Sequence, residues 1–124
     1  MTVDDTLLMR RFPTVVDTPC KNIDRIYPLK QRQVSEIYSR AAQYDIIKRI
    51  IVFGSSVTAR CHIDSDLDLC IDADVSDGMK VYEMQKAIGE ICDWRCDIIM
   101  YASMGQTLKR TIQDEGVVIY ERTA

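Results

Sequence analysis

Two aspartates separated by one residue, Asp66 and Asp68, are the side chains of this sequence best suited to chemistry. They open a stretch, 66–72, in which polar and apolar residues alternate as in a strand with one buried face. Residues i and i+2 of a strand point to the same side, with Cα atoms about 6.5–7 Å apart. Two carboxylates at this spacing repel each other, and divalent cations such as Mg²⁺, which prefer oxygen ligands, relieve the repulsion. The pair therefore predicts a magnesium site.

A glycine and a serine, Gly54-Ser55, precede Asp66 by ten intervening residues. An apolar stretch, 50–53, leads directly into this pair, as expected for a buried strand that ends where the backbone must approach something closely. Glycine lets phosphate oxygens come near the backbone, and the N–H groups at the start of a following helix attract anions. The sequence therefore predicts a phosphate-binding turn beside the aspartate pair.

Other sites built from similar residues fit less well. An EF-hand beginning at Asp64 would need glycine in place of Leu69 and glutamate in place of Val75. A P-loop would need Gly-Lys-Ser/Thr after Gly54, and a Ser-His-Asp hydrolase is disfavoured because His62 is the only histidine. Cys61 with His62, and the pair Cys92 and Cys96, could be considered as zinc ligands. No second pair has the spacing of zinc ligands, so a zinc site is disfavoured.

The order Gly54-Ser55, ten residues, Asp66-Leu67-Asp68 resembles the signature of the polymerase-beta-like nucleotidyltransferase superfamily. The lengths of the chain and of the gap resemble those of its minimal nucleotidyltransferases (MNT). The resemblance runs in order over residues 46–120 and does not extend to the residues before them. Many relatives carry a glycine soon after the Gly-Ser pair, whereas residues 56–61 contain none.

Family members carry a third acidic residue on a neighbouring strand, and the stretch 95–100 resembles that strand with Asp97 in the acidic position. Asp93 is the other candidate, but it precedes the strand pattern. The resemblance thus implies a catalytic and metal-binding triad of Asp66, Asp68 and Asp97 that holds two Mg²⁺ ions. It assigns nucleotide binding to three further residues: Gly54, Ser55 and Ser65.

The resemblance also implies an enzyme that transfers a nucleoside monophosphate, AMP from ATP, to an acceptor hydroxyl and releases pyrophosphate. Asp97 would complete the shell of the second metal or help to remove the hydroxyl proton. Three basic residues are candidates to neutralise the pyrophosphate charge, and the sequence gives no reason to choose among them: Arg60, Arg95 and Lys109.

Minimal nucleotidyltransferases are often paired with a small helical HEPN-type protein, as antitoxin to toxin, and some transfer AMP to a tyrosine of that partner. The resemblance therefore implies a toxin–antitoxin system with a HEPN-type partner. Two other functions stay open: a non-catalytic, nucleotide-sensing antitoxin that masks its partner, and an antibiotic-type transferase acting on a small hydroxylated molecule. A homo-oligomer is also compatible with the sequence.

The composition indicates one domain of ordinary type. The chain has 124 residues, of which 47% are hydrophobic, and a net charge of −3, which disfavours nucleic acid as the main partner. Basic residues would precede an apolar stretch in a signal peptide, and neither that pattern nor a membrane-spanning stretch is present, so we expect a cytoplasmic protein. Five cysteines without framework spacing indicate reduced thiols.

The elements that would position the site follow from periodicity and capping residues. We expect an arm over 1–22 and a single α/β (α+β) nucleotidyltransferase domain over 23–124, with a mixed, mostly four-stranded sheet and helices packed on it. We expect Ser76 or Asp77 to cap the second long helix and Ser103 to cap the last, with Met104, Leu108 and Ile112 facing inward. The predicted helices span 29–44, 56–60 (one or two turns), 79–91 and the residues after 103, and the predicted strands span 48–53, 66–72, 95–101 and 117–121.

Overall fold

The computed structural model describes residues 11–62 and 64–122. Its centre is a four-stranded sheet in the order β3-β2-β1-β4, in which β1 is antiparallel to both neighbours and β2 is parallel to β3. The predicted mixed sheet is thus confirmed. The strands are β1 (Ile47–Phe53), β2 (Leu67–Ala73), β3 (Cys96–Met100) and β4 (Val117–Glu121).

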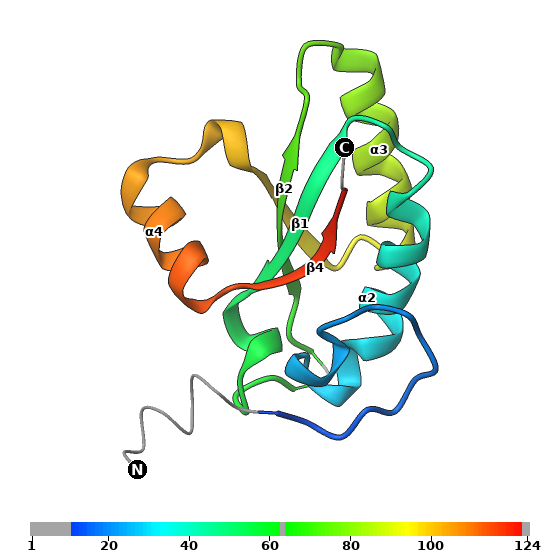
Figure 1. Ribbon diagram of the computed structural model, residues 1–124, viewed down its shortest axis with the longest axis vertical. Helices are drawn as coiled ribbons and strands as arrows, with labels where there is room; N and C mark the ends of the chain where they lie inside the picture. Colours follow the sequence, from blue (N-terminus) through cyan, green and yellow to red (C-terminus); the bar gives the residue numbers. More distant parts are fainter. Residues whose placement is uncertain (1–10, 63, 123–124) are drawn as a thin grey trace.

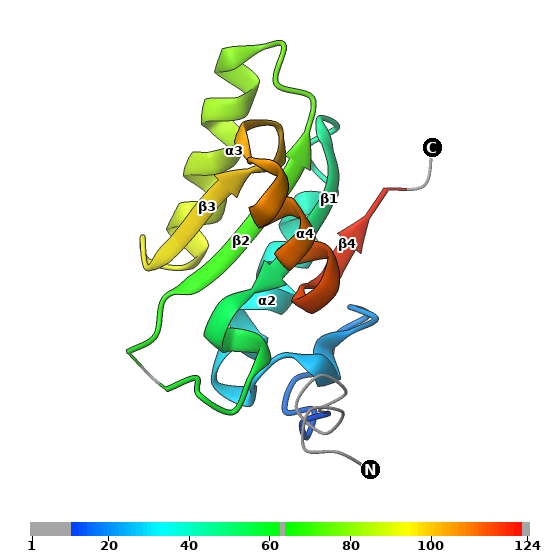
Figure 2. The same cartoon turned by 90° about the vertical axis from the view of Figure 1, so that its left-hand side faces the viewer.

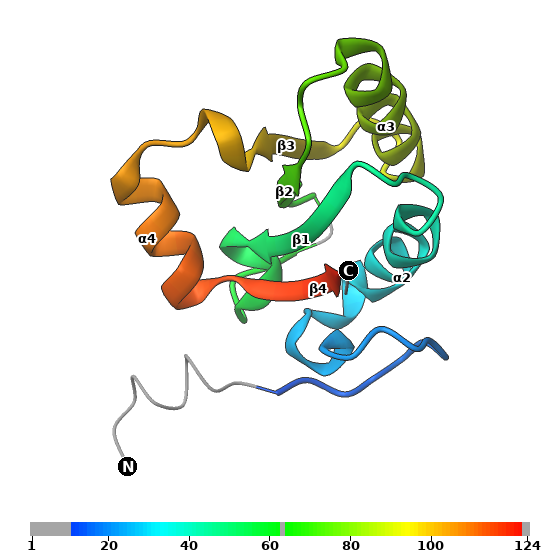
Figure 3. The same ribbon diagram turned by 45° about the horizontal axis from the view of Figure 1, so that its top comes forward.

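The two faces of the sheet are covered unequally. Helices α2 (Pro28–Ala41) and α3 (Gly78–Ile91) pack on one face, and α4 (Gln106–Glu115) lies on the other (Figures 1–3). Successive residues of β2 point to opposite faces of the sheet. Leu67, Leu69 and Ile71 belong to the larger core under α2 and α3, whereas Cys70 belongs to the smaller core under α4. Asp68 shares the face of Cys70, so the carboxylates belong to the less covered side.

Caps and contacts explain where the helices begin. Asp77 caps α3 as predicted, since its carboxylate accepts from the N–H groups of Met79 and Lys80. The predicted cap at Ser103 is wrong: this residue lies in a short turn, η3 (Tyr101–Ser103), and α4 begins later without a side-chain cap. Leu108, predicted to face inward, has 36% of its surface exposed, whereas Met104 and Ile112 are buried as predicted.

The segment before α2 is held by side chains rather than by a sheet or a long helix. The buried amide of Gln31 accepts from the N–H of Val15 and donates to the carbonyls of Pro13 and Ile26, at 2.8–2.9 Å. Asn22 donates to the carbonyl of Val118 in β4 at 2.7 Å. Residues 1–10 of the predicted arm lie outside the described residues. The described helices include none that is long and apolar enough to cross a membrane.

Candidate functional site

The structure brings Asp68 and Asp97 together. The parallel register of β2 and β3 sets these residues opposite each other, close enough for their carboxylates to interact. Burial raises the pKa of Asp68, and the negative charges of Asp97 and Asp66 raise it further. The three carboxylates predicted from the sequence therefore form one electrostatic cluster.

Asp66, the third carboxylate, is turned toward a cation. It lies just before β2 rather than in the strand, and its Oδ1 is 3.9 Å from Nε of Arg95. Both side chains are about half exposed, so this ion pair is weak and easily exchanged. Within residues 11–62 and 64–122, no three carboxylate, thiol or imidazole side chains already surround a point where a metal ion could sit. The catalytic and metal-binding roles of the triad therefore stay predictions, and the zinc hypothesis gains no support.

Gly54 lies directly against the carboxylate of Asp68. Its φ of 75° lies in the left-handed region that favours glycine, and a Cβ atom there would be 2.2 Å from Oδ2 of Asp68. The chain then enters a short turn, η2 (Gly54–Val57). In this turn the hydroxyl of Ser56 is buried without a hydrogen-bond partner in the described residues, which leaves one polar group of the bend uncommitted. Because glycine has no side chain, the turn η2 can lie directly against Asp68 of β2.

A cavity of about 510 Å³ lies on the other side of this bend, toward β4 and the end of α4. Gly54, Ser55 and Arg60 line it, together with Arg25, which precedes α2, and the acidic pair Asp114 and Glu115. Sequence patterns do not identify Arg25, because it lies 29 positions before Gly54 and belongs to no motif.

The other predicted site residues lie elsewhere. The ammonium of Lys109 is over the ring of Tyr101, 4.6 Å from its centre, and Arg95 is beside Asp66, so of the three candidate cations only Arg60 is at the Gly-Ser bend. Ser65 is half-buried, and its hydroxyl accepts from the N–H of His62 at 3.1 Å. The nucleotide-binding role of Ser65 thus stays a prediction.

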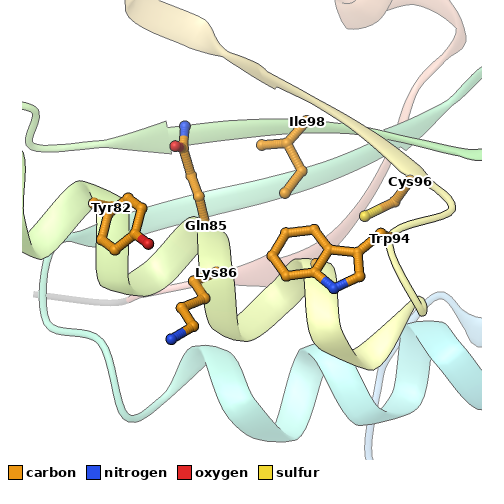
Figure 4. Close-up of a pocket in the computed structure, with 7 residues that line it drawn as sticks. Tyr82, Gln85, Lys86, Trp94, Cys96 and Ile98 are labelled. Carbon is orange, nitrogen blue, oxygen red and sulfur yellow. The ribbon is translucent and has the colours of Figure 1, made fainter.

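A second depression, of about 390 Å³, lies on the opposite face of the sheet. Figure 4 shows the exposed rings of Tyr82 and Trp94 at its two ends, with Cys96 and Ile98 of β3 between the strand and α3. These two β3 residues alternate with Asp97 along the strand and so point away from the carboxylates. The depression is therefore separate from the carboxylate cluster.

Comparison with known proteins agrees with this architecture. A toxin–antitoxin complex of MntA and HpeT carrying two substitutions is 17% identical, with a TM-score of 0.57 over 73% of this chain and 74% of that chain. A tri-AMPylated Shewanella oneidensis HEPN toxin in complex with MNT antitoxin is 19% identical, with a TM-score of 0.56 over 75% and 73%. A toxin–antitoxin structure with AMP-PNP is 18% identical, with a TM-score of 0.57 over 74% and 73%.

At these identities the solved structures establish the fold alone, and a search of curated proteins finds no match. The family follows from a separate comparison. A family model described as polymerase beta, nucleotidyltransferase matches residues 35–124, which include the Gly-Ser bend and the three carboxylates. This chain therefore belongs to the polymerase beta family of nucleotidyltransferases.

Proposed function

We propose that this chain transfers AMP from ATP to a tyrosine hydroxyl of a HEPN-type partner protein, in an Mg²⁺-dependent reaction, and thereby acts as an antitoxin. The observation that carries the proposal is the contact between Asp68 and Asp97 beside Gly54, in a chain of the nucleotidyltransferase family. The choice of partner is supported by the similar complexes, one of which holds a tri-AMPylated HEPN toxin with its MNT antitoxin. The choice of ATP is supported by the similar complex with AMP-PNP.

The carboxylate cluster suits a hard divalent cation. Its members offer oxygen ligands, and the pKa of Asp68 is raised by burial and then by the negative charges of Asp97 and Asp66. Asp68 and Asp97 would hold Mg²⁺, and Asp66 would join them after leaving Arg95. When bound, Mg²⁺ lowers the pKa of the attacking hydroxyl and offsets the charge of the phosphates.

The sheet order supports a placement of the two substrates on opposite sides of Asp68. Gly54 and Ser55 follow β1 on one side, where their backbone and hydroxyl groups would orient the phosphates of ATP. Asp97 lies on β3 on the other side and is exposed, so it would receive the acceptor hydroxyl and accept its proton. The leaving pyrophosphate would then face the cavity that contains Arg60.

Replacing Arg60 with alanine should weaken ATP binding more than it slows transfer. A charge-assisted hydrogen bond to a phosphate contributes about 1.5–3 kcal/mol, so KM for ATP should rise about 10–100-fold. Steady-state kinetics with varied ATP measure this change. Arg32→Ala, which removes an exposed arginine of α2, is the matched control and should behave like the unaltered protein. An unchanged KM in Arg60→Ala would assign the pyrophosphate contact to another residue.

The proposal is tested by incubating the chain with a HEPN-type partner, Mg²⁺ and ATP labelled on the α-phosphate. We expect labelled partner, with AMP on a tyrosine identified by mass spectrometry, and no label when that tyrosine is replaced by phenylalanine. The double variant Asp66→Ala, Asp68→Ala should transfer no AMP. Labelling that persists in this variant would contradict the assignment of the site.

One observation favours a second candidate function. Because Asp66 is paired with Arg95 in the described structure, a non-catalytic antitoxin that only masks its partner deserves a test of its own. Neutralisation of the HEPN protein in growing cells separates the two functions, because masking should survive the double aspartate substitution and AMP transfer should not. Labelling of an aminoglycoside in place of the protein would instead identify a small-molecule transferase.

A further inference from the structure

Asp66 belongs to a loop whose described residues, 62 and 64–66, are mostly exposed. Asp64 and Asp66 are exposed, and Ser65 is half-buried. The hydrogen bonds found within the described part of this loop join only His62 and Ser65, at 2.9 and 3.1 Å. The position of Asp66 therefore depends on groups from other parts of the chain.

One of these groups is the ammonium of Lys30. Lys30 lies in the first turn of α2, only 6% of its surface is exposed, and Nζ donates to the carbonyl oxygen of Ser65. None of the ion pairs found in the described residues includes Lys30. Burying an ammonium is costly, and an apolar side chain of similar size would fill this space without that cost. The placement of Lys30 thus suggests a role other than packing.

Three successive peptide units around Asp66 are each anchored by at least one hydrogen bond to another part of the chain. Arg95 Nη2 donates to the carbonyl of Asp64 at 2.8 Å, Lys30 holds the carbonyl of Ser65, and the N–H of Leu67 donates to the carbonyl of Arg95 at 3.1 Å. Because each peptide unit is planar, fixing its carbonyl or N–H fixes the direction of the chain. The Cα atom of Asp66 is consequently held on both sides, and its side chain keeps the freedom to leave Arg95.

We propose that Lys30 is a positioning residue for the carboxylate site. By holding the peptide between Ser65 and Asp66, Lys30 keeps the Asp66 carboxylate within reach of Asp68 and Asp97 when a divalent cation binds. Lys30 reaches the loop from α2, which packs on the face of the sheet opposite the carboxylates, so it acts through the backbone and not on the substrate (Figure 3). This inference rests on the proposed function, since it assumes that the three aspartates bind a metal.

The test measures metal binding directly, with Mn²⁺ as the probe and the free ion monitored by electron paramagnetic resonance. Lys30→Met should raise the Kd for Mn²⁺ about 10–100-fold, the usual effect of removing a group that orients a metal ligand. Lys30→Arg, which keeps the charge and the donors, should restore most of the affinity. Lys80→Met removes an exposed lysine of α3 and is the matched control, with no change expected.

Transfer kinetics provide a second readout. In Lys30→Met the Mg²⁺ concentration for half-maximal transfer should rise by the same factor as the Kd for Mn²⁺. At saturating Mg²⁺, KM for ATP should change by less than about threefold, because the side chain of Lys30 donates to the carbonyl of Ser65 and not to the Gly-Ser bend. A larger rise in KM for ATP than in the Mg²⁺ requirement would contradict the proposal.

The possible outcomes separate this inference from the proposed function. If the unaltered protein binds Mn²⁺ and transfers AMP, and Lys30→Met does both equally well, only the role of Lys30 is overturned. If the unaltered protein neither binds Mn²⁺ nor transfers AMP, the proposed function fails and this inference fails with it. Circular dichroism checks folding; should Lys30→Met not fold, Lys30→Gln replaces it. Failure of both variants to fold would make Lys30 a core residue and overturn the proposal.

Discussion

Replacing Asp68 with asparagine is expected to abolish AMP transfer and to make the protein more stable at neutral pH. A metal ligand contributes several kcal/mol to stabilisation of the transition state, and its loss corresponds to a decrease in rate of about 10³-fold or more. The folded protein meanwhile no longer buries an ionised carboxylate, the largest cause of the raised pKa of Asp68, and loses the repulsion from Asp97 and Asp66. Activity and stability should therefore change in opposite directions.

The gain in stability has a defined pH dependence. Folding raises the pKa of Asp68 above its ordinary value of 3.8, so the ionised carboxylate destabilises the folded protein. Above the folded pKa this penalty is complete, and it fades as the pH falls toward 3.8, below which both states are protonated. We expect Asp68→Asn to raise Tm by roughly 3–5 °C at pH 7, about 1 kcal/mol after solvent screening, and by nothing near pH 3.

Thermal unfolding in EDTA measures this effect, and Asp72→Asn is its control. Asp72 lies on the same face of β2, but its Oδ2 is 3.3 Å from Nε of Arg49, so its removal should lower Tm slightly and leave transfer intact. Added Mg²⁺ should raise the Tm of the unaltered protein and not that of Asp68→Asn. A lower Tm for Asp68→Asn at pH 7 would show that Asp68 is not repelled by its neighbours.

Replacing Gly54 with alanine is expected to lower both activity and stability. The new Cβ would meet Oδ2 of Asp68 at 2.2 Å, and the φ of 75° would strain any L-residue. We expect the free energy of unfolding to fall by about 1–3 kcal/mol. We expect transfer to fall about 10²–10³-fold, because displacement of a reacting group by about 1 Å costs about 10² in rate and the bend moves as well. Urea unfolding and the labelled-ATP assay measure the two effects.

Two further variants separate the causes of this loss. Gly105→Ala is the matched control, since among the described residues, apart from its two chain neighbours, no atom lies within 4 Å of its new Cβ, and it should leave stability and transfer unchanged. Adding Asp68→Ala to Gly54→Ala removes the atom that clashes and should recover part of the lost stability, beyond the sum of the single effects. If the double variant is no more stable than additivity predicts, backbone strain alone accounts for the loss.

The sequence predicted the parts of the molecule that depend on local pattern. Alternation over 66–72 located β2 and its two faces, and Asp77 capped its helix as expected. The last helix was harder, because its first turn is polar and offers several possible starts, so Ser103 and Leu108 were misplaced. The pairing of Asp97 with Asp68 followed only from the family resemblance, since local pattern does not fix the register of parallel strands.

Contacts between distant segments were beyond the reach of sequence patterns. Lys30 resembles any other lysine of an amphipathic helix, and its link to Ser65 spans 35 positions. Gln31 likewise joins its own helix to an irregular segment, and Arg25 lines the same cavity as the Gly-Ser bend from a stretch without a motif. The surroundings of each of these polar groups form only in the folded chain, so no local rule identifies them.

The place of Asp97 on the outermost strand has a consequence for substrate choice. In the described residues β3 is an edge strand of the sheet and Asp97 is exposed, so bulk water would reach the same carboxylates as the proposed tyrosine acceptor. An enzyme with such an open flank cannot select its acceptor by the shape of a closed pocket. Discrimination against hydrolysis of ATP would then be supplied by the docked protein itself, whose own surface would exclude solvent at the moment of transfer.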